Sequence, residues 1–214
     1  METQELKNAW NASEKNLENL WTLNMRCIEM VQTQKAKSKL NGLAAFKSVA
    51  IILGILYVLF LGILVYGNHF KNLYFTFSIG IIMVINIVAI AVYIKHLVLI
   101  SQINFGESII NAQKKLAELQ ASTINITRII WLQLPFWCTW FWSSNWINNN
   151  TANFLLTAFP IALFFAVVAV WLFKNISLQN SHKKWFRILF STTEWTSVIK
   201  AIEFINEIDE FKKD

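Results

Sequence analysis

A long run without a charged residue, Ile129–Phe173, constrains this chain more than any other feature. At about 1.5 Å per residue, a helix of this length would reach roughly 68 Å, whereas the hydrocarbon layer of a bilayer is about 30 Å thick. Two crossings joined by a short turn fit that length. The polar stretch 148–153, Asn-Asn-Asn-Thr-Ala-Asn, can supply the turn. The run therefore predicts a helical hairpin in a membrane, with spans at 129–147 and 154–173.

Two further segments have the same character. Residues 48–70 and 72–94 contain no Lys, Arg, Asp or Glu, and each is long enough to cross a bilayer once. Hydrophobic residues make up 55% of the chain and charged residues only 15%, with a mean hydropathy of +0.42, which lies outside the usual globular range. We therefore expect an all-α integral membrane protein with four transmembrane helices and helical extensions in the cytosol.

The basic residues predict the orientation of these spans. Of the 19 Lys and Arg residues, only Lys71 lies in one of the two short turns on the opposite side from the termini. By the positive-inside rule, both termini and the central loop 95–128 are expected on the cytoplasmic side of a bacterial inner membrane. The net charge of +6 then follows the membrane topology, so we expect no direct binding of nucleic acid.

Three segments are expected in the cytosol. Residues 1–47 form a polar helix, 95–128 a helical hairpin that turns at 104–107, and 174–214 an interfacial segment followed by an amphipathic helix. This last helix is expected to pack on the N-terminal helix or on the hairpin. Lys35, Lys37, Lys39 and Lys47 are expected to meet anionic lipid headgroups, and His96 to lie at the membrane interface.

Apolar residues at three- and four-residue steps mark the N-terminal and C-terminal helices as amphipathic. On the N-terminal helix the pattern is interrupted by Asn24. Its apolar face could pack on the protein's own cytosolic helices, or it could dock a partner protein in the helix-in-groove manner. The candidate docking residues on the two helices are Leu6, Trp10, Leu17, Trp21, Ile28, Trp195, Ile199 and Ile202.

Two residue types are expected to position the spans. Small residues let helices approach closely, either within one four-helix bundle or at the seam of a homodimer, and tryptophans favour the boundary between lipid and water. Pro135 and Pro160 are expected to kink the third and fourth spans. The small packing residues are Ala50, Gly54, Gly62, Ala158, Ala162 and Ala166, and the interfacial anchors are Trp137, Trp140, Trp142 and Trp146.

The sequence carries few signs of chemistry. No span contains a charged residue, which disfavours a proton-coupled transporter, and the amides of Asn86 and Gln133 suit hydrogen bonds between helices. A passive polar pore stays open as an alternative. Because no phosphate-binding loop, zinc spacing or nucleophile elbow occurs, we expect no enzyme activity, metal or cofactor. Cys27 and Cys138 are expected to be unpaired packing residues.

Several short motifs carry a family resemblance. They are Glu5-Leu6-Lys7 with Trp10, Gln113-Lys114-Lys115-Leu116, Leu119-Gln120-Ala121-Ser122-Thr123 and Leu132-Gln133-Leu134-Pro135-Phe136-Trp137. Together these motifs resemble those of a family of four-span inner-membrane proteins of Bacteroidota that has no assigned activity. The N-terminal motif is also similar to that of membrane-tethered anti-sigma factors, although this chain lacks the His and paired Cys of their zinc-containing type.

These observations lead to one functional hypothesis and one alternative. The hypothesis is a non-enzymatic inner-membrane scaffold or regulator whose cytosolic helices bind a cytosolic or membrane protein, with a sigma factor as a candidate implied by the resemblance. The alternative is a small oligomeric channel or a subunit of a transport complex. A lipid-modifying enzyme ranks third, because no cluster of ionisable residues marks either membrane face.

Overall fold

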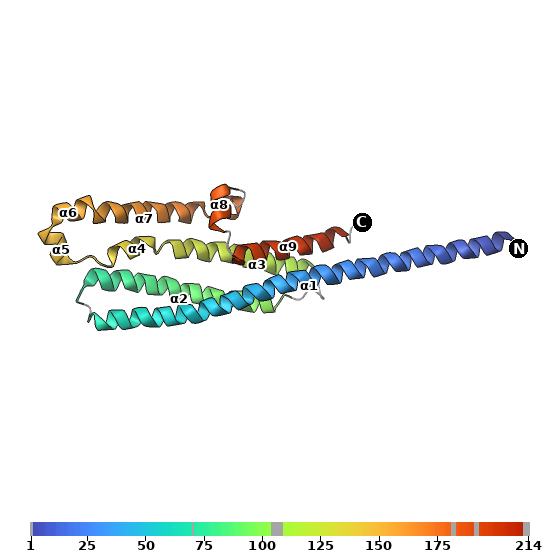
Figure 1. Ribbon diagram of the computed structural model, residues 1–214, viewed down its shortest axis with the longest axis horizontal. Coiled ribbons are helices and arrows are strands. Elements are labelled where there is room, and N and C mark those ends of the chain that lie inside the picture. The colour runs from blue at the N-terminus through green and yellow to red at the C-terminus, as the bar shows by residue number, and fades with distance from the viewer. Residues whose placement is uncertain (1, 70, 104–108, 181–182, 191–192, 212–214) are drawn as a thin grey trace.

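The computed structural model describes residues 2–69, 71–103, 109–180, 183–190 and 193–211, and these residues form helices without a strand (Figure 1). The all-α class is therefore confirmed. The predicted hairpin turn at 104–107 lies outside the described residues. The helices are α1 (Glu2–Gly67), α2 (Leu73–Ser101), α3 (Ile109–Trp131), α4 (Leu134–Thr139), α5 (Ser144–Asn149), α6 (Thr151–Leu156), α7 (Ala158–Asn175), α8 (Lys184–Leu189) and α9 (Thr193–Phe211), with a short 3₁₀ helix at Leu178–Asn180.

Helix α1 runs without a break through the two segments that the sequence assigns to a polar helix and a first span. It contains no proline, and proline is the residue that would interrupt its backbone hydrogen bonds. The helix ends at Gly67, and His69 then adopts a positive φ of 47°. Asn72 starts α2, because its side-chain oxygen accepts hydrogen bonds from the backbone N–H groups of Tyr74 and Phe75.

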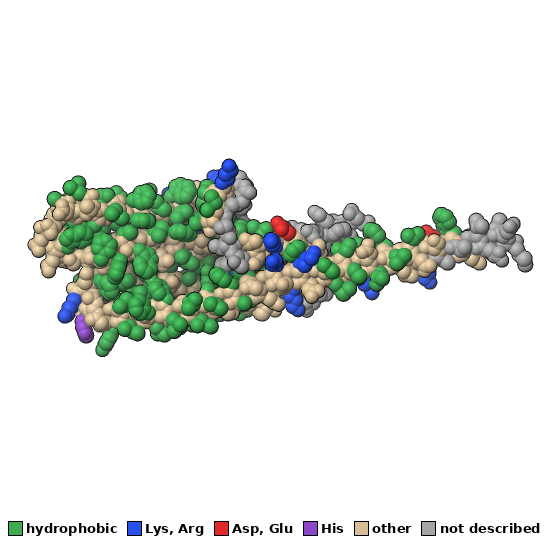
Figure 2. All heavy atoms as spheres, viewed as in Figure 1, with side chains coloured by type: hydrophobic (Ala, Val, Ile, Leu, Met, Phe, Trp, Pro, Cys, Tyr) green, Lys and Arg blue, Asp and Glu red, His purple; other side chains and the backbone are tan. Residues whose placement is uncertain are grey.

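The molecule divides lengthwise into two halves. The half that ends at the 68–72 turn exposes many apolar side chains, and we call it the apolar half; the half that holds both termini we call the polar half (Figure 2). In the apolar half the helices lie in chain order, with α1 beside α2, α2 beside α4 and α4 beside α7 (Figure 1). Both outer faces of this row are therefore open to the surroundings.

Three helices are long and apolar enough to cross a membrane, namely Ser13–Gly67 within α1, α2, and Thr151–Asn175 across α6 and α7. Their exposed aliphatic side chains are compatible with contact with lipid. The fourth predicted span, 129–147, is not a continuous helix, because it is divided among the end of α3, α4 and α5. A fourth crossing therefore stays a prediction, although α3, α4 and α5 follow one another along α2 in Figure 1.

The two prolines account for two of the interruptions. Helix α3 ends at Trp131, four residues before Pro135, and α6 ends at Leu156, four residues before Pro160. A proline has no N–H with which to bond the carbonyl four residues earlier, and its ring crowds that carbonyl. The chain between Trp131 and Pro135 tightens instead, with the Gln133 N–H donating to the Ile130 carbonyl at 3.2 Å.

Small residues pack the row from within. Ala158, Ala162 and Ala169 on α7 are buried, and α7 packs mainly on α4. On α1, a Cβ atom added to Gly54 would lie 3.1 Å from Cγ1 of Ile90 on α2. These contacts favour packing within one chain over a homodimer seam for the small residues. Ala50, Gly62 and Ala166 are half-buried in the same row.

The polar half has its own apolar core, in which α1, α2, α3 and α9 meet. Helix α9 packs along α1 and also contacts α3, so the C-terminal helix reaches both of the partners that the sequence allows for it. This core consists of Ala36, Leu40, Leu43, Ile100, Ala112, Leu116, Leu119, Val198 and Ala201.

We predict that Gly54→Ala destabilises the protein relative to Gly80→Ala. The added methyl group at Gly54 must displace the Ile90 side chain, whereas a Cβ at Gly80 meets nothing within 4 Å. Alanine otherwise favours a helix over glycine, so Gly80→Ala should be neutral or slightly stabilising. The expected difference in unfolding free energy is about 1–2 kcal/mol, measured by denaturation in mixed micelles. Equal stability of the two variants would contradict close packing of α1 on α2.

Candidate functional site

The N-terminal part of α1, residues 7–31, extends past the end of the bundle, and we call it the arm (Figure 1). Only its last residues lie beside another helix, since Val31 and Phe204 of α9 line a common pocket. Large apolar side chains on the arm face outwards. Trp10 is 73% exposed and Trp21 57%. Figure 2 shows apolar and charged side chains interspersed along this part of the molecule. The other exposed apolar residues of the arm are Leu17, Leu20, Leu23, Met30 and Val31.

The predicted docking residues thus fall into two groups. Trp10, Leu17 and Trp21 are exposed on the arm and Ile28 is half-buried, whereas the side chain of Leu6 lies outside the described part. Those on α9 face the protein itself. Trp195 is only 6% exposed, and Ile199 and Ile202 are partly buried against the apolar clusters. Among the docking residues whose side chains the structure describes, the exposed ones therefore all lie on the arm.

Trp195 belongs to an aromatic cluster with Phe186 and Phe190. The rings of Phe186 and Phe190 stack with centroids 4.2 Å apart, and the Trp195 ring lies 5.5 Å from that of Phe186. Phe186 is fully buried. The phenylalanines of this segment are thus buried, whereas Lys183 and Lys184 are exposed, and the interfacial position of the segment stays a prediction.

A buried cationic and polar cluster joins α1, α2 and α3 where the two halves meet. Lys47 is fully buried, and its ammonium lies over the ring of Tyr93, 4.1 Å from the centroid. The ring of Tyr93 in turn stacks on His96 with centroids 6.0 Å apart. The expectation that Lys47 contacts lipid headgroups is wrong, because the side chain turns inwards onto an aromatic face that attracts its charge.

His96 is also fully buried, so the prediction that it lies at the interface is wrong as well. Its Nε2 atom shares a hydrogen bond of 2.8 Å with the Ser122 hydroxyl on α3, and its Nδ1 atom has no hydrogen-bond partner among the described residues.

Periodicity along α1 could have revealed this cluster. Lys47 lies four residues after Leu43 and seven after Leu40, both of which are buried. It therefore shares their helix face. Residue type alone predicts a lysine in contact with water or lipid headgroups, whereas the periodicity of α1 predicts burial at this position.

Between α2 and α3, the exposed ion pair of Lys95 and Glu118, at 2.9 Å, adds little to stability.

We predict that Ser122→Ala lowers the unfolding free energy by about 1–3 kcal/mol, because it removes the hydroxyl that the buried His96 ring contacts. The double variant His96→Leu/Ser122→Ala should lose less than the sum of the two single losses, since no buried ring is then left unsatisfied. The double-mutant cycle is measured by denaturation in mixed micelles. Additive losses would show that the two side chains are not coupled.

At the opposite end of the molecule, the predicted tryptophan anchors divide into two kinds. Trp137 and Trp140 are 43% and 39% exposed, as lipid-facing anchors would be. Trp142 and Trp146 instead pack edge-on against Phe154 on α6, with centroids 4.9 and 5.7 Å apart. These contacts hold α6 against α5, and only Asn150 separates the two helices where the sequence predicts a turn over 148–153.

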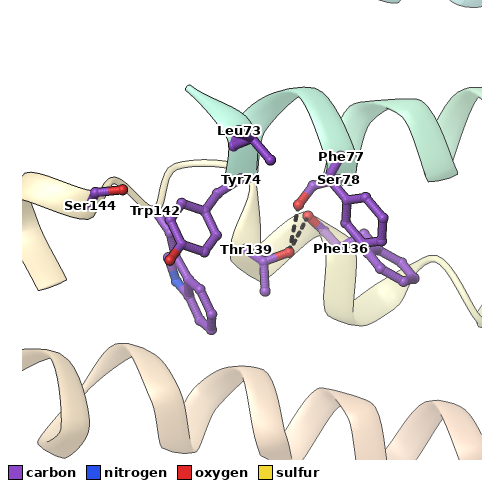
Figure 3. Close-up of a pocket in the computed structure, with 8 residues that line it drawn as sticks. All are labelled: Leu73, Tyr74, Phe77, Ser78, Phe136, Thr139, Trp142 and Ser144. Atoms are coloured by element: carbon purple, nitrogen blue, oxygen red, sulfur yellow. Dashed lines mark hydrogen bonds between the residues drawn. The ribbon is translucent and has the colours of Figure 1, made fainter. Parts of the chain in front are cut away.

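A cavity of about 590 Å³ opens beside these rings, between α2 and α4 (Figure 3). The hydroxyls of Ser78 and Thr139 line it and hydrogen-bond to each other at 2.8 Å (Figure 3). Since each hydroxyl is satisfied by the other, this pair links α2 to α4. Deeper in the row, the Asn86 amide donates to the Gln133 side-chain oxygen at 3.2 Å and so forms the predicted interhelical hydrogen bond. The cavity is lined by Leu73, Tyr74, Phe77, Ser78, Phe136, Thr139, Trp142 and Ser144.

We predict that Asn72→Asp separates the two roles of Asn72. The asparagine caps α2 with its side-chain oxygen and donates from Nδ2 to the Trp142 carbonyl at 2.7 Å. Aspartate keeps the cap and loses the donor, whereas Asn72→Ala loses both. We expect Asn72→Ala to cost about 1–2 kcal/mol for the cap alone and Asn72→Asp to lie between it and the wild type in thermal unfolding. An alanine variant as stable as the wild type would contradict the capping role.

Among the described residues, no three His, Cys, Asp or Glu side chains come together as metal ligands would. Comparison with known proteins does not assign the chain to a group: no protein-family model, no curated protein and no solved structure matches it. The exposed apolar side chains of the arm are therefore the feature from which a function is inferred.

Proposed function

We propose that this protein is a non-enzymatic membrane scaffold or regulator that binds a protein partner through the arm of α1. The supporting observation is the exposed apolar face of the arm, which includes Trp10, Leu17 and Trp21. We place the protein in a bacterial inner membrane with both termini in the cytosol, following the distribution of its basic residues. A sigma factor is one candidate partner, by the resemblance of the N-terminal motif.

A helix that packs on no other helix is only marginally stable in water. Most helical stability in proteins comes from packing of an amphipathic face rather than from intrinsic propensity. The arm has such a face, yet Leu17 and Leu20 are 66% and 63% exposed. Covering these side chains would remove apolar surface from water at roughly 25 cal/mol per Å². The arm is therefore best suited to a protein contact that completes its packing.

The base of the arm is well suited to hold it in place. Ala36, Leu40 and Leu43 of α1 are buried against α2, α3 and α9, so the helix leaves the polar half from a packed core. Because α1 continues into the apolar half without a break, a partner held on the arm would be fixed relative to the membrane. This is the arrangement that a membrane scaffold requires.

The alternative of an oligomeric channel has less support. Asn86 and Gln133, the amides expected to line a polar passage, hydrogen-bond to each other, and Asn86 also donates to the Ile82 carbonyl at 2.8 Å. The Asn86 amide group and the Gln133 side-chain oxygen are thus engaged in helix packing.

The test is site-specific photo-crosslinking in living cells. A photoreactive amino acid replaces Leu17 on the apolar face or, as the matched control, Thr22, whose side chain lies on the opposite face of the same helix. We expect a covalent protein adduct from position 17 and at least about tenfold less from position 22. Trp21→Asp should remove the adduct, because it places a charge in the apolar contact. Absence of an adduct at position 17, or equal adducts at both positions, would count against the proposal.

A further inference from the structure

We infer that the partner of the arm is a second copy of this chain, and that two arms pair as a parallel coiled coil. This inference rests on the proposed function, since it names the partner that covers the same apolar face. It is carried by the register of the exposed side chains, by the way the membrane would orient two copies, and by the apolar area that the arms present.

The arm carries a heptad repeat. With Trp10 assigned to position a, Leu17, Asn24 and Val31 follow at a, and Ser13, Leu20 and Cys27 fall at d, so Ser13 and Asn24 are the polar members of the repeat. A repeat of seven with apolar a and d positions is the pattern that produces knobs-into-holes packing between helices. Among these residues, Leu17 and Leu20 are exposed over more than half of their surface, and Cys27 is exposed as well.

Asn24 fits this register as a specificity residue. A single asparagine at an a position, with leucine at d, favours a two-stranded parallel coiled coil and fixes its register, because the two asparagines can hydrogen-bond across the seam. The interruption of the apolar pattern at Asn24 is thereby explained.

The charges of the arm are compatible with self-pairing. The e and g positions flank the seam, and between residues 9 and 31 only Glu14 among them is charged. In a parallel pair Glu14 would face Ala9 of the other copy, so no like charges meet. The remaining charged residues of this stretch occupy the outer positions b, c and f, and they are Lys15, Glu18, Arg26 and Glu29.

The a and d positions, through which two arms would pair, and the intramolecular core occupy different faces of α1. At 100° per residue, the a and d positions of the arm point roughly 140° away from Ala36, Leu40 and Leu43, which pack inside the chain. Pairing of two arms therefore leaves that core in place. Two copies anchored in one membrane also extend their arms in the same direction, so their helices can meet only in the parallel sense.

The apolar area that each arm could bury is of the same order as that of a standard protein interface. At roughly 150–250 Å² for a buried aromatic side chain, Trp10 and Trp21 alone would bury on the order of 250 Å² per arm. A stable interface of standard size buries about 800 Å² per partner. The aliphatic a and d residues, together with Leu23 and Met30 at g, extend the contact along the whole arm.

Cysteine crosslinking of the full chain in native membranes tests this inference. The chain has two cysteines, so Cys138→Ser leaves Cys27 at position d as the single probe. Under copper–phenanthroline oxidation we expect a Cys27–Cys27 disulfide dimer. The matched control, Cys27→Ser/Cys138→Ser/Thr22→Cys, moves the thiol to the outer position f and should give at least about tenfold less dimer. Adding Leu20→Asp to the probe should abolish the dimer, whereas Lys15→Asp should preserve it.

Each other outcome overturns the inference in a recognisable way. Equal crosslinking at positions 27 and 22 would indicate random collision, and a trimer or larger particle in nanodisc mass measurements would exclude the pair. If photo-crosslinks at Leu17 yield only a different protein, the self-pairing fails and the proposed function survives. If Cys27 stays reactive towards maleimide in membranes and position 17 gives no protein adduct, both fail.

Discussion

The continuity of α1 is the constraint on which the rest of the structure depends. In an apolar layer every backbone N–H and C=O group has to be paired within the helix, and α1 meets this requirement over its whole length from Glu2 to Gly67. The same helix supplies one side of the core in the polar half and the first member of the row in the apolar half. Its two ends thus belong to one rigid element, so the arm and the row share a single orientation.

Much of this architecture could be predicted from sequence periodicity and composition. The long apolar segments, the breaks one turn before Pro135 and Pro160, and the amphipathic character of the C-terminal helix all follow from local rules. The interruption at residues 140–143 does not, because no proline marks it. It depends on the Ser143 side chain, which caps α5 by accepting a hydrogen bond from the Trp146 N–H at 3.2 Å.

The packing partners of the buried Lys47 and His96 could not be predicted from the sequence, for a different reason. Residue type places both side chains at a membrane edge, whereas their burial depends on Tyr93 and Ser122, which approach from other helices. A sequence shows the period of one helix but not which helix faces it. The same limit applies to the docking face: periodicity identified Trp10 and Trp195 equally, and only the fold separates the exposed residue from the buried one.

The length of the arm has a consequence of its own. Trp10 precedes Lys47 by 37 residues, so at about 1.5 Å per residue it lies roughly 55 Å from the junction of the two halves. If the apolar half is embedded, the tip of the arm stands at up to this distance from the membrane surface, less any tilt. A protein captured there is kept clear of the lipid headgroups, at a spacing fixed by the number of residues in the helix.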